Sequence, residues 1–209
     1  MNFSVIVTGV LEENCYIVSD EAGVCVIVDP GEDSETIADH IAENDLEPKA
    51  ILLTHGHFDH IGAVVALKER YEELPVYIHH DDRKMLTEPD QQGAFDFGVN
   101  DEFEADNFVE DGEILSFGDL KIKVLHTPGH TKGSCCYLCE NTLFSGDTLF
   151  RRSIGRVDLP GGNESAMMKT LKNVIAELPE ELDVCPGHGE FTTIGEEIAE
   201  NPYIKEAID

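Results

Sequence analysis

The first half of the chain alternates short apolar runs with polar or glycine-containing breaks. β-Branched residues dominate the first three runs, which predicts an antiparallel meander of strands. The stretch after Pro30 then places Ile37 and Ile41 on one face of an amphipathic helix, and residues 61–71 repeat that helical spacing. Further apolar runs before and after this second helix predict two more strands. The expected strands of this half are 3–8, 14–18, 24–29, 50–54 and 75–79.

The second half of the chain repeats this plan. Apolar runs of strand length are followed by two stretches with helical spacing, at 163–178 and 195–208. The expected strands are 112–117, 120–126, 134–140, 142–146 and a short one that begins at 182. This order favours an α+β protein in which two sheets pack face to face with helices outside.

Composition narrows the class of protein. The 209 residues fit one domain, and no apolar run approaches the roughly 18 residues of a membrane helix. The formal net charge of -29, with 43 acids against 14 Lys plus Arg, argues against nucleic acid and anionic membranes as partners. The start lacks a basic leader, and the six scattered cysteines are expected to be buried reduced thiols. We therefore expect a cytoplasmic protein.

Four side chains of the metal-ligand type follow the expected strand 50–54. They are His55, His57, Asp59 and His60, within the stretch THGHFDHIG. In an extended segment the i and i+2 side chains point the same way, so His55 and His57 can grip one ion. Asp59 and His60 are expected on the following turn, where they can face a second ion. Imidazole and carboxylate suit zinc and other divalent transition metals.

Two metal sites need further ligands, and three other strand ends offer them. His130 lies in HTPGHT, Asp147 in LFSGDT and His188 in VCPGHG, each beside a glycine that lets the backbone turn sharply. A carboxylate has two oxygens, so Asp147 is able to bridge two ions. The sequence thus supplies five histidines and two aspartates.

The motifs H-x-H-x-D-H, TPGHT, GDTLF and PGHG, in this order, resemble the metallo-β-lactamase superfamily, and within it the glyoxalase II-like (hydroxyacylglutathione hydrolase-like) branch. The resemblance spans nearly the whole chain and implies an αββα four-layer sandwich formed by residues 1–209. It assigns His55, His57 and His130 to a first metal, and Asp59, His60 and His188 to a second, with Asp147 as the bridge. Asp29 in VDPG matches a position that orients a ligand histidine, although DPG is also a common turn.

The implied reaction is hydrolysis by a hydroxide that bridges two divalent ions, most simply zinc, with iron or manganese as alternatives. Asp59 and Asp147 are the expected catalytic carboxylates. No acid beyond the ligands is apparent, which favours a thioester because a thiolate leaves unaided, with lactones and activated esters still open. Arg156 matches the glyoxalase II position that holds the glutathione moiety.

Two departures bear on the substrate. The C-terminal helical domain of glyoxalase II is not expected here, and Asp158 and the Gly189-Glu190 pair replace the family's aromatic residues. A small hydroxyacyl thioester therefore fits better than glutathione conjugates specifically.

Other reactions of the same fold remain open. A persulfide dioxygenase would use one iron, here held by His55, His130 and Asp147. A nuclease conflicts with the net charge, and a secreted β-lactamase with the missing leader and with Asp59. Residues 87–107 lack periodicity and are expected to form a rim over the site, where Phe95, Phe97 and Phe103 either shield substrate or anchor the loop.

Overall fold

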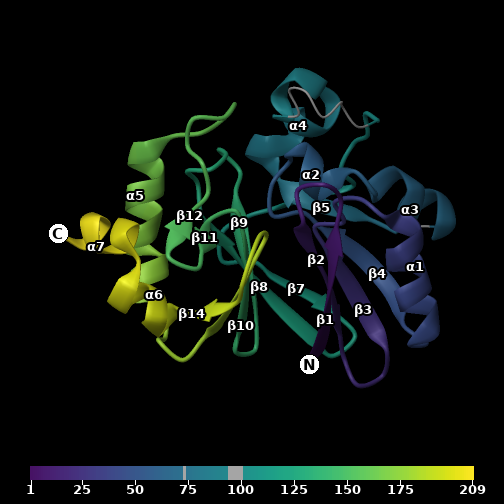
Figure 1. Ribbon diagram of the computed structural model, residues 1–209. Coiled ribbons are helices and arrows are strands. Elements are labelled where there is room, and N and C mark those ends of the chain that lie inside the picture. The colour runs from purple at the N-terminus through teal and green to yellow at the C-terminus, as the bar shows by residue number, and fades with distance from the viewer. Residues whose placement is uncertain (73, 94–100) are drawn as a thin grey trace.

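The computed structural model describes residues 1–72, 74–93 and 101–209, and shows two six-stranded sheets packed face to face (Figure 1). The first sheet follows chain order, and its first three strands form the antiparallel meander expected from the sequence. The other three run parallel to the third. Its strands are β1 (Asn2–Thr8), β2 (Glu13–Ser19), β3 (Val24–Val28), β4 (Glu47–Leu52), β5 (Val76–His79) and β6 (Asn107–Val109).

The helical elements of this half are α1 (Ser34–Glu43), α2 (Phe58–Ile61), α3 (Val64–Arg70), α4 (Arg83–Thr87) and the 3-10 turns η1 (His80–Asp82) and η2 (Pro89–Gln91). Helices α1 and α3 pack against each other outside the first sheet. Parallel strands need such crossover connections, which explains why helices appear between β3, β4 and β5.

The second sheet has the order β14-β13-β10-β9-β8-β7. Its strands are β7 (Ile114–Phe117), β8 (Leu120–His126), β9 (Cys135–Cys139), β10 (Thr142–Gly146), β13 (Asp183–Pro186) and β14 (Thr192–Thr193). Strands β11 (Leu149–Phe150) and β12 (Ser153–Ile154) form a separate small hairpin. The helical elements are α5 (Glu164–Asn173), η3 (Ile175–Glu177), α6 (Ile194–Glu200) and α7 (Pro202–Ile208).

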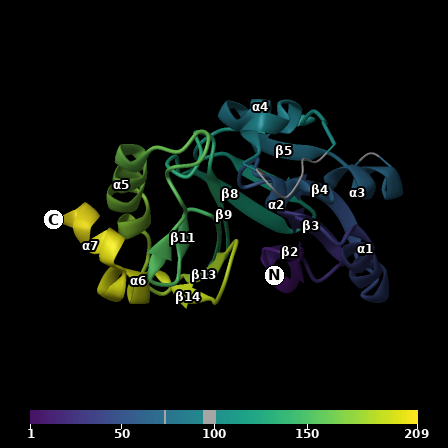
Figure 2. The same ribbon diagram turned by 45° about the horizontal axis from the view of Figure 1, so that its top comes forward.

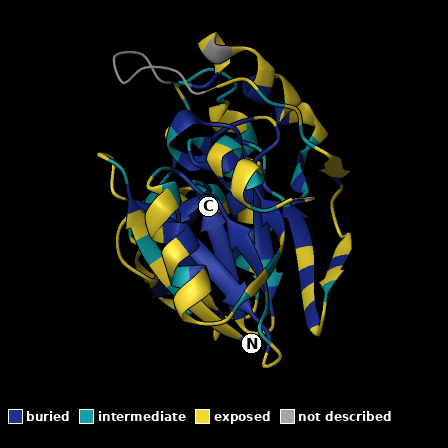
Figure 3. Cartoon of the chain, turned by 90° about the vertical axis from the view of Figure 1, so that its right-hand side faces the viewer, coloured by how far each residue is buried: buried dark blue, intermediate teal, exposed yellow. Residues whose placement is uncertain are grey.

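Three apolar layers separate four layers of secondary structure. Strand β2 shows the principle, because alternate side chains point to opposite faces. Its Ile17 packs with Ile37 and Leu67 of the first helical layer, whereas Tyr16 packs with Phe144 between the two sheets. A third layer packs the second sheet against α5, α6 and α7. The expected αββα sandwich is confirmed, with helices on both outer sides (Figure 2) and the buried strands inside (Figure 3).

Helix boundaries differ from the sequence expectation at three places. The helix predicted over 163–178 ends at Asn173 as α5, and the 3-10 turn η3 follows it. The helix predicted over 195–208 is two helices, because Pro202 has no amide hydrogen to continue α6 and instead begins α7. The Asn201 side chain caps the new helix by accepting a hydrogen bond from the Tyr203 amide at 3.0 Å. The helix predicted over 61–71 begins only at Val64, as α3. Ile61 instead ends the short helix α2, which carries Asp59 and His60 where a turn was expected.

The unpatterned segment 87–107 is described only in part. Gly93 lies beside the His57 ring, and Phe103 packs against the apolar layer between the first sheet and its helices. Residues 94–100, which include Phe95 and Phe97, lie outside the described residues, so the rim over the site stays a prediction.

Two further expectations concern the chemistry of the chain. All six cysteines are buried and free. Within the described ranges, every helix is too short or too polar to cross a bilayer.

Candidate metal centre

Four strand ends carry the candidate ligands to one edge of the sandwich. Strand β4 leads into the loop and helix with residues 55–60, and β8, β10 and β13 lead to His130, Asp147 and His188. Strands β8 and β10 both run antiparallel to β9, and β13 runs parallel to β10. The carboxyl ends of these three strands therefore meet at the same edge, opposite the end of β4 from the other sheet.

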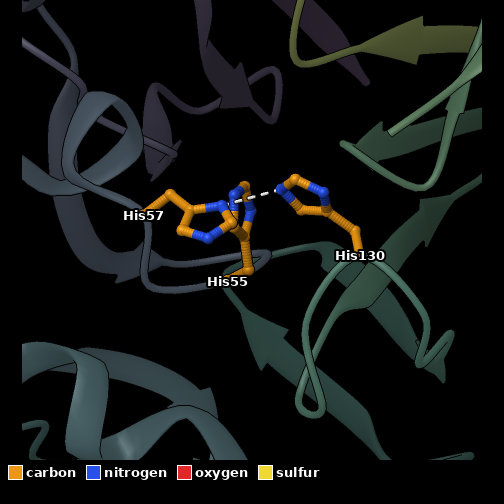
Figure 4. A group of neighbouring side chains, drawn as sticks. All are labelled: His55, His57 and His130. Atoms are coloured by element: carbon orange, nitrogen blue, oxygen red, sulfur yellow. Dashed lines mark hydrogen bonds between the residues drawn. The ribbon is translucent and has the colours of Figure 1, made fainter. Parts of the chain in front are cut away.

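The first group consists of His55, His57 and His130, all at least 97% buried. His57 Nδ1 lies 2.7 Å from His130 Nε2, and the ring centre of His55 lies 4.8 and 4.7 Å from those of His57 and His130. Figure 4 shows the three imidazoles facing one another across the gap between the two sheets. The structure thus brings together the three residues predicted for the first metal.

The second group consists of Asp59, His60 and His188. Asp59 Oδ2 lies 3.2 Å from His188 Nε2 and 3.9 Å from His60 Nε2. Helix α2 places Asp59 and His60 on adjacent positions, and the turn after β13 brings in His188 from the second sheet. These are the three residues predicted for the second metal.

Asp147 lies between the two groups. Its Oδ2 is 3.5 Å from His130 Nε2, whereas its Oδ1 is 3.3 Å from His60 Nε2 and 3.8 Å from His188 Nε2. Each oxygen of the carboxylate therefore faces a different group. This is the arrangement that a bridging ligand requires.

Hydrogen bonds behind the cluster fix the rings. His60 Nδ1 lies 3.0 Å from Asp29 Oδ2, and Asp29 Oδ1 accepts the Thr54 amide at 2.7 Å. The Thr54 hydroxyl lies 3.0 Å from His55 Nδ1. Asp29 has a left-handed φ of 49°, a strained conformation for this residue. Its carboxylate thus stands where an orienting residue is expected, and outer partners of this kind hold ligand rings in place.

Backbone carbonyl groups orient two more of the histidines. His130 Nδ1 lies 2.7 Å from the Arg156 carbonyl oxygen, and His188 Nδ1 lies 3.1 Å from that of Leu11. Because a carbonyl oxygen only accepts, Nδ1 of both rings carries the hydrogen. In the neutral form of each ring, Nε2 then holds the lone pair that a metal ion would take.

Two glycines permit the close approach of the strand ends. A Cβ on Gly187 would lie 2.5 Å from Asp147 Oδ1 and 2.7 Å from the His60 ring. Gly146 has a φ of 47°, and a Cβ there would lie 2.2 Å from the Thr54 hydroxyl. Side chains at these positions would push the two sheets apart at the cluster.

Burial and neighbouring charges divide the histidines into two kinds. Burial, aided by His130, lowers the pKa of His57 to about 3, and burial also takes the pKa of His55 well below its usual range. Burial opposes the charged form of His60 too, but the Asp147 and Asp59 carboxylates raise its pKa. His60 in turn holds the Asp147 carboxyl ionised, with a pKa well below its usual range despite burial.

The cluster fits divalent cations. Four of its buried atoms, His55 Nε2, His57 Nε2, His60 Nε2 and Asp147 Oδ1, make no hydrogen bond within the described part of the chain. A buried polar atom without a hydrogen bond costs free energy, and a bound cation would remove that cost. Neutral imidazole and ionised carboxylate are the ligand forms of these groups.

A pocket of about 420 Å³ opens onto the cluster. His57, Asp59, His130, Asp147 and His188 form its floor, whereas His55 and His60 lie behind them. The walls are mostly apolar: Leu11, Phe58, Phe150, Ile154 and Leu159 contribute, together with Arg156, Gly93 and Ser153. Arg156 lines the pocket and its guanidinium is paired with Asp158, so its contact with a substrate stays a prediction.

Sequence reasoning missed the residues that hold the His188 loop. Asn14 donates through Nδ2 to the carbonyl oxygens of Pro186 and Gly189 at 3.0 and 3.1 Å, and the Tyr16 hydroxyl donates to Pro186 at 2.7 Å. The signal was present, because ENCY places two polar residues at the start of a strand that is otherwise apolar. Buried polar side chains in such a position need partners.

Comparison with known proteins identifies the family. The model of the metallo-beta-lactamase superfamily matches residues 8–188. The hydroxyacylglutathione hydrolase GloC of Haemophilus influenzae is 34% identical over 209 residues, with 98% of each chain covered.

Solved structures agree with this fold. The BLEG-1 B3 metallo-beta-lactamase is 39% identical, with a TM-score of 0.92 and coverage of 97% of this chain and 99% of that one. TTHA1623 in a di-iron-bound form is 39% identical, with a TM-score of 0.86 and coverage of 96% and 99%. ETHE1 from Myxococcus xanthus is 31% identical, with a TM-score of 0.83 and coverage of 100% and 88%. On the sequence match and the fold together, this chain belongs to the metallo-beta-lactamase superfamily.

Proposed function

We propose that the protein hydrolyses a small hydroxyacyl thioester at a centre of two divalent cations. The observation that carries the proposal is the position of Asp147, whose two oxygens face two separate groups of ligand-type residues at the floor of one pocket. The seven residues His55, His57, Asp59, His60, His130, Asp147 and His188 would hold the ions. A purely structural site would instead surround each ion with four protein ligands.

Two divalent cations, when bound, make a water molecule acidic enough to attack at neutral pH and polarise a carbonyl oxygen. The chain supplies the setting for that chemistry. Asp59 and Asp147 lie at the pocket floor as ionised carboxylates, because neighbouring imidazoles outweigh burial and lower the pKa of both. Apolar walls exclude bulk water from the carbonyl group, and the left-handed Asp29 holds the His60 ring that faces both carboxylates.

The leaving group selects the substrate class. A thiol has a pKa of about 8.5 and departs as thiolate without a proton donor, whereas an amine needs one. Among the described residues that line the pocket, every titratable one except Arg156 is a proposed ligand, and Arg156 is too weak an acid to donate. This supports a thioester. The relative named GloC is consistent with a hydroxyacyl group, and S-lactoylglutathione is the first compound to test.

The donor set of five imidazoles and two carboxylates accommodates zinc, iron or manganese. We propose zinc first because it needs no redox partner, while the di-iron form of TTHA1623 supports iron as the main alternative. Six free buried thiols favour a reducing compartment such as the cytoplasm. The net charge of -29 favours a small molecule over nucleic acid as partner.

One observation favours a second candidate function. His55, His130 and Asp147 alone supply two imidazoles and a carboxylate, the set that suits a single iron with open positions for oxygen chemistry. A persulfide dioxygenase would use that set, and the similarity to ETHE1 is compatible with it.

A substrate panel with the metal-loaded protein separates the candidates. We expect turnover of S-lactoylglutathione or a smaller lactoyl thioester, followed by thiol release, with little activity on phosphodiesters and β-lactams. Oxygen uptake with a persulfide, in the absence of thioester hydrolysis, would replace the proposal with the dioxygenase. Preferential β-lactam hydrolysis would also overturn it.

A further inference from the structure

In the described part of the chain, the wall of the pocket above the cluster carries one arginine. Of the described residues that line the pocket, Arg156 alone is lysine or arginine, and it stands among the apolar residues Ile154 and Leu159. The hydrogen bond between His130 Nδ1 and the Arg156 carbonyl oxygen, 2.7 Å long, ties the backbone of Arg156 to the metal-binding cluster. The backbone position from which the Arg156 side chain extends is therefore fixed relative to the metal-binding cluster.

The guanidinium of Arg156 is already occupied. Its Nε donates to Asp158 Oδ1 and its Nη2 to Asp158 Oδ2, both at 2.9 Å. This is the two-point geometry that an arginine offers to a free carboxylate, and a substrate carboxylate would need the same two hydrogens. Asp158 itself is not among the residues that line the pocket.

We propose that Asp158 is a specificity-determining residue, which fills the Arg156 guanidinium and makes the pocket favour thioesters whose thiol part is uncharged. A substrate carboxylate at this position must displace Asp158 and then remains close to its negative charge. An uncharged thiol part meets only the apolar walls and leaves the ion pair intact. This inference rests on the proposed thioester hydrolysis and defines the substrate class of the same pocket.

The solvent exposure of Arg156 and Asp158 sets how strongly Asp158 can affect substrate preference. The side chains of Arg156 and Asp158 are 67% and 68% exposed, so water and salt screen their attraction. Asp158 is therefore a weak competitor that shifts preference rather than an absolute block. We expect a change of about three- to tenfold, as for a single charge-assisted hydrogen bond at a screened site.

The test compares two thioesters of nearly identical shape. Lactoyl thioesters of 3-mercaptopropionate and of 3-mercaptopropionamide differ only in whether the thiol part carries a charge. For Asp158→Asn, the kcat/KM ratio of the anionic to the neutral substrate should rise about three- to tenfold over wild type at low salt. Glu47→Gln is the matched control, because Glu47 also forms an exposed ion pair, with Lys49, and lies outside the pocket lining. Its ratio should stay within about twofold of wild type.

Repeating the test in an Arg156→Lys variant separates the effect of the guanidinium geometry from that of the positive charge. Arg156→Lys keeps the positive charge but loses the two-point geometry. Asp158→Asn should therefore improve the anionic substrate less in the Arg156→Lys background than in the wild type. An equal gain in both backgrounds, or an unchanged ratio for Asp158→Asn alone, would overturn the inference. Turnover of the neutral thioester by wild type would still uphold the proposed function, whereas its absence would overturn that function instead.

Discussion

At the scale of single residues, the centre depends on polar groups that are buried where apolar ones would pack. Asp147 is the clearest case, because each of its oxygens faces a different group of imidazoles. Asp29 is the contrasting case, since its contacts are with the Thr54 amide and hydroxyl and with His60 Nδ1, behind the cluster. In the proposed two-metal centre, Asp147 would touch both ions and Asp29 would orient the ligand His60.

Replacing these two carboxylates should therefore have unequal effects. Asp147→Ala removes a contact with both ions, and we expect it to reduce kcat/KM for a thioester more than Asp29→Ala does. Loss of an outer partner alone typically costs 10- to 100-fold in affinity or activity, which sets the expected size for Asp29→Ala. Circular dichroism should show that Asp147→Ala keeps its secondary structure. A larger loss in Asp29→Ala would contradict the bridging position of Asp147.

Another buried carboxylate, Asp82, links the loop that carries His130 to the end of strand β5 in the first sheet. Asp82 accepts hydrogen bonds from the Thr131 hydroxyl at 2.6 Å and from the Gly133 amide at 2.7 Å. Burial outweighs these bonds and raises the pKa of Asp82 to about 6. The folded protein therefore binds this proton more tightly than the unfolded chain, in which an aspartate has a pKa of about 3.9.

The stabilisation that Asp82 contributes should decrease as the pH rises. The contribution of Asp82 to the unfolding free energy is fully present below about pH 4 and is lost as the pH rises through about 6. The difference between wild type and Asp82→Asn, measured by urea unfolding, should fall over that range. Asp39→Asn, on the exposed side of α1, is the control for the loss of one carboxylate. A difference that rises with pH would show that the hydrogen bonds, rather than burial, dominate.

At the scale of elements, the sequence predicted which strands carry ligands, because each ligand motif follows an apolar run. It predicted less well what holds those strand ends in place. Pro202 indicates a helix break, but the apolar spacing of 195–208 continues across it and favoured one helix. The pairing of Arg156 with Asp158 was not predictable from spacing alone, since arginines in so acidic a chain have many potential partners. The motif ENCY marks Asn14 as a polar residue at the start of a strand, but its partners are backbone carbonyl groups of a distant loop, which the sequence does not identify.

Asn14 gives the element-scale prediction. Asn14→Ala removes two hydrogen bonds to the loop that carries His188, so the second ion should be held about tenfold less tightly, as for other outer partners of ligands. Chelator competition measures this affinity without relying on turnover. Asn141→Ala is the matched control, because that side chain also donates to a backbone carbonyl group, Glu181, but at an exposed turn. Equal effects of the two variants would rule out the loop-holding role.

At the scale of the whole molecule, four layers of secondary structure are held by three apolar layers, while the surface carries a large excess of negative charge. The αββα arrangement could be predicted from the order of elements and the family resemblance together. The net charge of -29 does not determine the fold, but it affects stability, because 43 acidic side chains repel one another in the compact state.

Salt should therefore stabilise the protein. Raising NaCl from about 0.01 M to about 0.15 M shortens the Debye length from about 30 Å to about 8 Å and screens this repulsion. We expect the unfolding free energy to increase over that range, as measured by urea denaturation. KCl should act alike at equal ionic strength, because screening does not depend on the identity of the cation. A fall in stability with salt would show that attractive ion pairs outweigh the repulsion.

The most direct measurement of the central claim is the number of metal ions bound per chain. Elemental analysis and native mass spectrometry of the metal-loaded protein should give close to two divalent ions. His57→Ala and His188→Ala, which remove one ligand from each of the two groups, should each lower that number toward one. A single ion in the wild type, or undiminished metal content in both variants, would contradict a two-metal centre bridged by Asp147.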